Sequence, residues 1–128
     1  MTLAPTRAIR GAVLAATLLA APLAAQAPAC RPLPGDLGAR AEAGWAAYRA
    51  GDLAAAERAF GAVLARCPDD AGALNGRGYA ALRRDDLAAA AVSFERVLRA
   101  APDDVDALTG RGLVAWRQGD LEATRRLF

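Results

Sequence analysis

The chain repeats itself every 34 residues, and this period limits the folds that it can adopt. The segment Ala-Gly-Asp-Leu at 50–53 returns as Arg-Asp-Asp-Leu at 84–87 and as Gln-Gly-Asp-Leu at 118–121. The same step relates single residues elsewhere: Gly44, Gly78 and Gly112, then Phe60, Phe94 and Phe128, then Pro68 and Pro102. A fixed period of this length is typical of units that stack on their neighbours. We therefore expect an extended binding surface rather than a catalytic pocket.

Composition favours helices and disfavours most enzyme chemistry. Of the 128 residues, 55% are apolar but only 5% are aromatic, and alanine dominates the apolar set. An alanine-rich chain with few β-branched residues favours helix. The chain has no His and no Lys, and Ser93 is its only serine, which excludes a Ser-His-Asp triad and Schiff-base chemistry. We expect no enzyme, and acid–base chemistry by paired carboxylates is a remote alternative.

The acidic and sulfur-containing residues do not predict a cofactor or a metal site. Asp-Asp pairs lie at 69–70, 85–86 and 103–104, but they lack the alternating ligands and the distant Glu of a calcium loop. The positions of these pairs, just before expected helices, favour helix capping instead. Two cysteines without a histidine do not make a zinc ligand set.

Residues 1–27 lie outside the repeat and have the order of a secretory signal peptide. Arg7 and Arg10 are their only charges, residues 11–25 are almost wholly apolar, and Ala-Gln-Ala at 25–27 is a small-x-small cleavage site. We expect cleavage after Ala27 and a periplasmic protein. One alternative is an uncleaved membrane anchor, for which the apolar run is short. Another is a lipoprotein attached through Cys30, although the residues before it are unusual for that signal.

Cleavage would leave the protein formally neutral. The chain has 16 basic and 14 acidic residues, and losing Arg7 and Arg10 lowers the first number to 14. A strong basic field for nucleic acid and a polybasic membrane patch are therefore both absent. We expect contact with a membrane only through the signal peptide or through an associated complex.

After a linker at 28–36, the repeat is expected to form helix pairs. The units are 37–70, 71–104 and an incomplete 105–128. In the first unit, a helix over 37–50 ends at Gly51, Asp52 caps a second helix over 53–66, and Pro68 ends that helix. The second unit follows the same plan, except that Asp85 replaces the turn glycine at a small local cost.

Export would also give the two cysteines a role. If 37–50 and 53–66 pack as an antiparallel pair, the end of the second helix lies beside the start of the first. Cys67 follows the second helix and Cys30 precedes the first by a short linker. In an oxidising compartment these residues are expected to form a disulfide, and two free thiols are the alternative.

The repeated residues resemble those of the tetratricopeptide repeat (TPR) family. The resemblance rests on the small residue in each first helix, the Gly-Asp-Leu turn, the Ala and then Phe of each second helix, and the terminal Pro. It covers residues 37–128. Ala43, Arg77 and Arg111 depart from it, because the family usually has Leu at this position, and Thr124 replaces the small Ala in unit three. The resemblance implies an all-α solenoid of about 2.5–3 helix-turn-helix repeats.

The resemblance also implies where a protein or peptide partner binds. In similar proteins the first helix of each pair lines a concave groove. Carried onto this sequence, the groove-facing residues are Trp45, Tyr48, Arg49, Asn75, Tyr79, Leu82, Arg83, Thr109, Leu113, Trp116 and Arg117.

Each kind of groove residue has a second interpretation. Tyr and Trp are common binding anchors, but they also pack between units as core. The arginines at 49, 83 and 117 suit an acidic partner, but each also falls in the last turn of a helix, where a cation is favourable.

We predict a protein-binding scaffold or adaptor of the bacterial cell envelope, whose partner no residue identifies. The alternative is the N-terminal TPR segment of a larger envelope protein, of the polysaccharide-export or outer-membrane assembly type. This alternative rests on Phe128, which matches the buried positions Phe60 and Phe94 but ends the chain. Three explanations compete for the exposed position of Phe128. The chain is a fragment of a longer array, or it self-associates through this uncapped end, or its last helix frays.

Overall fold

Six helices follow one another as antiparallel pairs in the computed structural model, which describes residues 2–4 and 30–128. They are α1 (Asp36–Ala50), α2 (Leu53–Arg66), α3 (Ala71–Arg83), α4 (Leu87–Ala100), α5 (Val105–Arg117) and α6 (Leu121–Leu127). The described residues form no strand. The predicted all-α fold is confirmed, and its helices begin and end within one residue of the predicted positions in the first unit.

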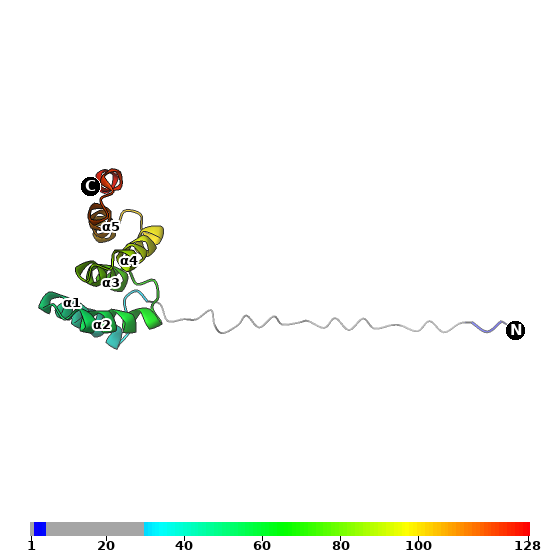
Figure 1. Ribbon diagram of the computed structural model, residues 1–128. Coiled ribbons are helices and arrows are strands. Elements are labelled where there is room, and N and C mark those ends of the chain that lie inside the picture. The colour runs from blue at the N-terminus through cyan, green and yellow to red at the C-terminus, as the bar shows by residue number, and fades with distance from the viewer. Residues whose placement is uncertain (1, 5–29) are drawn as a thin grey trace.

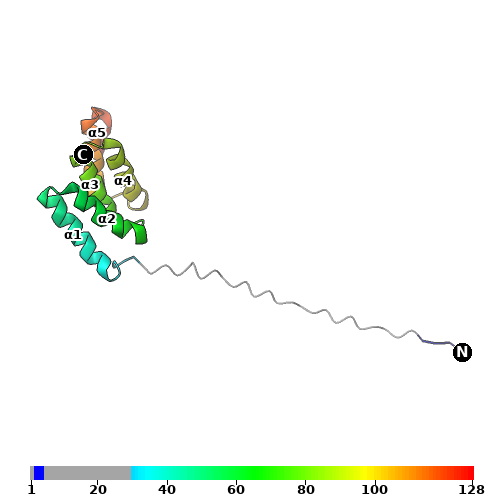
Figure 2. The same cartoon turned by 60° about the horizontal axis from the view of Figure 1, so that its bottom comes forward.

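The helices form two layers (Figures 1 and 2). Each helix packs on the next one in the chain, and α1 also contacts α3, while α3 contacts α5. The second helices, α2 and α4, do not contact each other in this way. Because the first helices lie closer together than the second ones, the stack curves toward the layer of α1, α3 and α5. We call this layer the inner face and the layer of α2, α4 and α6 the outer face.

Aspartates cap the N-termini of α2 to α6, and residues with a left-handed backbone conformation follow several helices. The carboxylate of Asp52 accepts a hydrogen bond of 3.0 Å from the Ala55 N–H, and four further aspartates cap in the same way: Asp70, Asp86, Asp104 and Asp120. Gly51 and Gly119 have φ of 82° and 76°, and Asp85 holds the equivalent turn at φ 62°. The predicted capping is confirmed, and Asp85 has the conformation that normally favours glycine.

Phenylalanine rings fill the space between neighbouring units. Phe60 is fully buried, and a Cβ built on Gly44 or Gly76 would lie 2.8 or 2.4 Å from its ring. Phe94 stands in the same relation to Gly78 and Gly110. The glycines at 44 and 78 therefore admit a ring from the paired helix, and those at 76 and 110 admit the ring of the preceding unit.

Phe128 occupies the equivalent place in the third unit. Its ring lies against Gly112, at 2.4 Å from a Cβ built there, but 69% of the residue is exposed. Phe60 and Phe94 each have a second glycine helix on their other side, whereas no described residue supplies one to Phe128.

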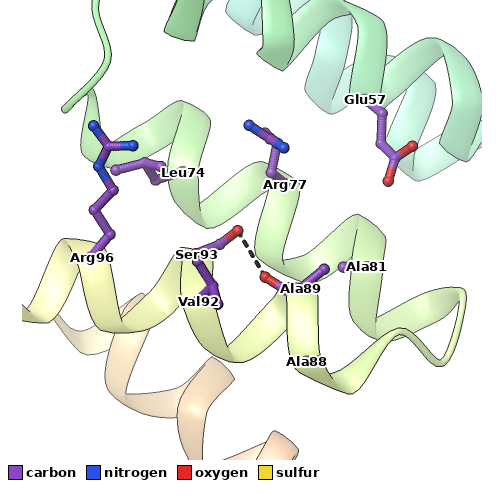
Figure 3. Close-up of a pocket in the computed structure, with 9 residues that line it drawn as sticks. All are labelled: Glu57, Leu74, Arg77, Ala81, Ala88, Ala89, Val92, Ser93 and Arg96. Atoms are coloured by element: carbon purple, nitrogen blue, oxygen red, sulfur yellow. Dashed lines mark hydrogen bonds between the residues drawn. The ribbon is translucent and has the colours of Figure 1, made fainter.

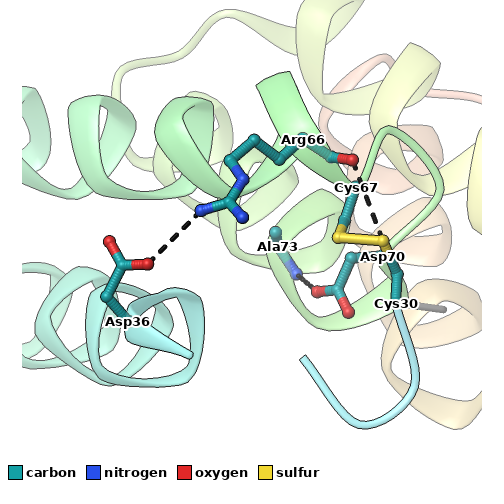
Figure 4. The surroundings of a disulfide bond; sticks show 6 residues. All are labelled: Cys30, Asp36, Arg66, Cys67, Asp70 and Ala73. Carbon is teal, nitrogen blue, oxygen red and sulfur yellow. Dashed lines mark hydrogen bonds and ion pairs between the residues drawn. A yellow bond between two sulfur atoms is a disulfide. The ribbon is translucent and has the colours of Figure 1, made fainter. Parts of the chain in front are cut away.

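A disulfide joins the segment before α1 to the end of α2 (Figure 4). The sulfur atoms of Cys30 and Cys67 are 2.06 Å apart, and 37 positions separate the two residues in the chain. Beside the bridge, Arg66 at the end of α2 lies 3.3 Å from a carboxylate oxygen of Asp36 at the start of α1. The first helix pair is thus held at this end by one covalent link and one exposed ion pair.

The predicted signal peptide lies outside the described residues, apart from positions 2–4. Among the helices that the structure describes, none has the length and apolar character needed to cross a bilayer.

Candidate binding surface on the inner helices

Three inner helices contribute to one pocket of about 210 Å³. Its lining residues come from α1 (Tyr48), α3 (Tyr79, Leu82 and Arg83) and α5 (Leu113, Trp116 and Arg117). The structure thus brings together seven of the eleven residues predicted to face a groove. We call this pocket and its rim the inner groove.

The most exposed apolar part of the inner groove lies on α5. Trp116 is 61% exposed and Leu113 is 36% exposed, although both are large apolar residues. Their α5 neighbours Val114 and Ala115 are buried. The helix therefore buries one face and presents an aromatic and aliphatic pair on the other.

Tyr79 forms the wall between α3 and α5. Its ring packs edge-on against Phe94, with 5.1 Å between ring centroids, and its hydroxyl donates to the Asp106 carbonyl oxygen at 2.8 Å. Burial, followed by the negative charge of Asp106, raises the pKa of the Tyr79 hydroxyl. The phenol therefore stays neutral and keeps donating near neutral pH, which fixes the orientation of the ring.

Trp45 lies next to the inner groove rather than in its lining. Its ring packs edge-on against Phe60 at 5.1 Å and against Tyr48 at 5.7 Å between centroids. The residue is half-buried and belongs to the packing around the core. Of the two tryptophans, only Trp116 presents most of its surface to solvent.

Asn75 was expected to face a partner, but the structure buries it to 4% exposure. Its amide nitrogen donates at 3.2 Å to the Asp104 carboxylate, which also caps α5. Its amide oxygen is buried and has no hydrogen-bond partner among the described residues. Asn75 thus links α3 to the start of α5 and offers no groove surface. Thr109, in the equivalent position of unit three, is half-buried.

The recurring arginines connect one unit to the one before it. Arg83, in the last turn of α3, donates to the Tyr48 carbonyl at the end of α1, and its guanidinium lies 4.9 Å from the Tyr48 ring centroid. Arg117, at the end of α5, donates to the Leu82 carbonyl at 2.8 Å. Each arginine therefore adds a side-chain donor to a carbonyl at the C-terminus of the preceding inner helix, where the backbone N–H of Gly51 or Asp85 already donates to the same oxygen.

Arg49 is exposed, no helix precedes α1 among the described residues, and Arg49 makes no hydrogen bond with any of them. Sequence reasoning offered a partner's carboxylate or the residue's own helix dipole for these arginines. It missed the link between units, for which the only signal was the recurrence at the repeat step.

Most acidic residues in the described part of the chain cap a helix or pair with an arginine. Five aspartates cap helices, and other carboxylates pair with arginines, as Glu95 does with Arg111 at 2.9 Å. The described residues contain no group of three or more His, Cys, Asp or Glu side chains that could hold a metal ion.

Comparison with known families agrees with this geometry. The tetratricopeptide repeat model matches residues 42–96 and 86–127, which is well over half of the chain. The chain belongs to the tetratricopeptide repeat family. TPR units form protein–protein interaction modules, so the TPR helices described here provide a surface for a protein partner. A search of curated proteins finds no match to the chain.

Proposed function

We propose that this TPR protein is an adaptor that binds a segment of a partner protein in the inner groove. The observation that carries the proposal is the exposed pair Trp116 and Leu113, set beside the fixed ring of Tyr79. An aromatic residue with few rotatable bonds gives a large contact area at low entropic cost.

The groove favours a segment with an apolar side chain and backbone carbonyls nearby. The pocket of about 210 Å³ accepts one side chain of moderate size. Arg83 and Arg117 line the same pocket, and each directs one N–H group to a protein carbonyl. A guanidinium has five N–H donors, so each arginine keeps donors for the partner. Because these arginines are already held in place, less entropy is lost when a partner binds.

Trp116 provides both the test and the reporter. Replacing Trp45 with Phe leaves Trp116 as the one tryptophan, whose emission should shift to shorter wavelength when a partner covers it. The partner would be isolated by co-purification with the tagged full chain and identified by mass spectrometry. Trp116→Ala should then weaken binding by about tenfold or more, because hot-spot truncations cost about 2 kcal/mol or more.

Circular dichroism separates loss of the surface from loss of the fold. Trp116 is 61% exposed, so Trp116→Ala should leave the helical signal and the melting temperature nearly unchanged. If the variant binds the purified partner as tightly as the wild type does, the inner groove is not the binding surface.

We further propose that the adaptor acts in the bacterial cell envelope, after export through the signal peptide at 1–27. The basic, apolar and small-residue order of this segment supports the proposal, and a disulfide in the structure agrees with an oxidising compartment. Expression of the full chain with a C-terminal tag in a bacterium should give a periplasmic product that begins at Pro28. An unprocessed product in the cytosol would contradict the proposed location.

A further inference from the structure

A second hollow lies on the outer face, away from the inner groove. It has a volume of about 330 Å³ and opens between α2 and α4, above α3 (Figure 3). Its lining is formed by Glu57 of α2, by Leu74, Arg77 and Ala81 of α3, and by Ala88, Ala89, Val92, Ser93 and Arg96 of α4. We call this site the outer hollow. None of its residues lines the inner groove.

Arg77 differs from its counterpart one repeat later. Arg111 holds the equivalent position, and its guanidinium pairs with Glu95 at 2.9 Å. One repeat earlier, the residue equivalent to Glu95 is Gly61. Arg77 is exposed, and it makes no hydrogen bond or ion pair with any residue that the structure describes. A carboxylate of the preceding unit therefore pairs with the arginine at Arg111, whereas the unit before Arg77 supplies no such carboxylate.

Packing does not require the glycine at position 61. A Cβ built on Gly61 meets no atom within 4 Å, whereas the Cβ atoms of Gly44 and Gly76 would collide with Phe60. Gly61 lies in the interior of α2, where glycine is among the least favourable residues. No contact of the described residues requires a glycine at position 61. Because the position carries no carboxylate, Arg77 lacks the ion pair that Arg111 makes with Glu95.

The other charges of the outer hollow already have partners. Glu57 pairs with Arg84, and Arg96 lies 2.9 Å from Asp69. Arg77 is thus the charged side chain of the outer hollow that has no ion-pair partner among the described residues. It lies beside apolar lining residues, of which Val92 is 62% exposed. A cation next to an exposed aliphatic surface is complementary to an anion next to an apolar side chain.

We propose that the outer hollow is a second docking site, which binds an acidic segment of a protein partner. In this site an Asp or Glu carboxylate of the segment pairs with Arg77, and a neighbouring apolar side chain lies on Val92. The site is separate from the inner groove, so the protein can hold two segments at once, one on each face.

The test uses the full chain and a displayed library of random twelve-residue peptides. Panning should select a group of peptides in which Asp or Glu stands next to an apolar residue. Synthetic copies of these peptides would then be titrated against the wild type and four variants by calorimetry. Arg77→Gln and Gly61→Glu should weaken their binding by roughly tenfold or more, because the first removes the cation and the second supplies an internal carboxylate.

Two matched variants serve as controls. Gly61→Ala makes the same change to the helix without the carboxylate and should bind these peptides as the wild type does. Trp116→Ala alters the inner groove alone and should also leave their binding unchanged. Thermal unfolding should show Gly61→Glu and Gly61→Ala to be at least as stable as the wild type, so that lost binding is not lost folding.

The outcomes separate the two faces. If panning selects no acidic peptides, or if Arg77→Gln binds the selected acidic peptides as tightly as the wild type does, the outer site does not exist. If these peptides lose binding in Trp116→Ala but not in Arg77→Gln, they occupy the inner groove, which overturns the outer site and supports the proposed function.

Discussion

Individual glycines set the distance between units of this protein. Phe60 and Phe94 each lie between two glycines, one on the paired helix and one on the next inner helix. Both rings are fully buried. At the position equivalent to Gly76 and Gly110, the first unit instead has Glu42, which is exposed. On α1, the first helix that the structure describes, the position that would receive the ring of a preceding unit is therefore charged and exposed.

Gly76→Ala should destabilise the protein by about 1–3 kcal/mol, the usual cost of overpacking a core. The added Cβ would lie 2.4 Å from the Phe60 ring, and this ring is enclosed on all sides. The expected effect opposes intrinsic helix propensity, which favours alanine by about 1 kcal/mol. Urea unfolding followed by circular dichroism measures the change.

Gly61→Ala is the matched control for this substitution. It makes the same chemical change inside a helix, but its Cβ meets no atom within 4 Å. It should therefore stabilise the protein by about 1 kcal/mol. Equal effects of the two substitutions would show that propensity, and not contact with Phe60, decides the outcome.

At the scale of the helix, the inner helices pack side by side and are also linked at their C-terminal ends. Arg83 and Arg117 each reach back to a carbonyl at the C-terminus of the preceding inner helix. Each bond adds a second donor to a carbonyl that also accepts a backbone N–H from the following turn. They also hold the guanidinium groups at the rim of the inner groove, so one interaction serves both the stack and the binding surface.

Arg117→Met should cost about 0.5–1.5 kcal/mol of stability, because it keeps most of the aliphatic stem but removes the donor to the Leu82 carbonyl and the exposed ion pair with Asp85 at 3.4 Å. The estimate is at the low end for a charged donor, since 43% of the side chain is exposed. Arg49→Met is the control at the same repeat position, because Arg49 reaches no carbonyl of a preceding helix among the described residues. A stability change beyond about 0.5 kcal/mol in Arg49→Met would show that the arginines act through their own helices.

Much of each helix was predictable, because its signals are local. Asp52 and the residue Gly51 before it determine a turn and a cap whatever the neighbouring units do. The role of Asn75 was not predictable in this way, because its partner Asp104 belongs to the next unit. The inner groove was partly predictable, since the family resemblance places first helices along it. The outer hollow required the register of two units to be compared, because what marks it is a missing carboxylate at Gly61.

At the scale of the whole molecule, the two faces of the stack differ in how they are built. The inner helices contact one another, so their exposed residues form one continuous surface across three units. The outer helices do not, so the space between α2 and α4 stays open above α3. The first helix pair, which contributes to both faces, is also the one that carries the Cys30–Cys67 bridge.

Removing this bridge should lower the free energy of unfolding by about 3–4 kcal/mol, the chain-entropy value for a loop of this length. The bridge closes a separation of 37 residues, which includes both helices of the first unit. Cys30→Ala is the better variant, because Cys67 is 1% exposed and its sulfur should stay in place. Urea unfolding should show the loss in Cys30→Ala, and a reducing agent should lower the wild type to the same value while leaving Cys30→Ala unchanged. A wild type that keeps its stability when fully reduced would mean that the ion pair of Arg66 and Asp36 and the helix packing hold the first pair without the bridge.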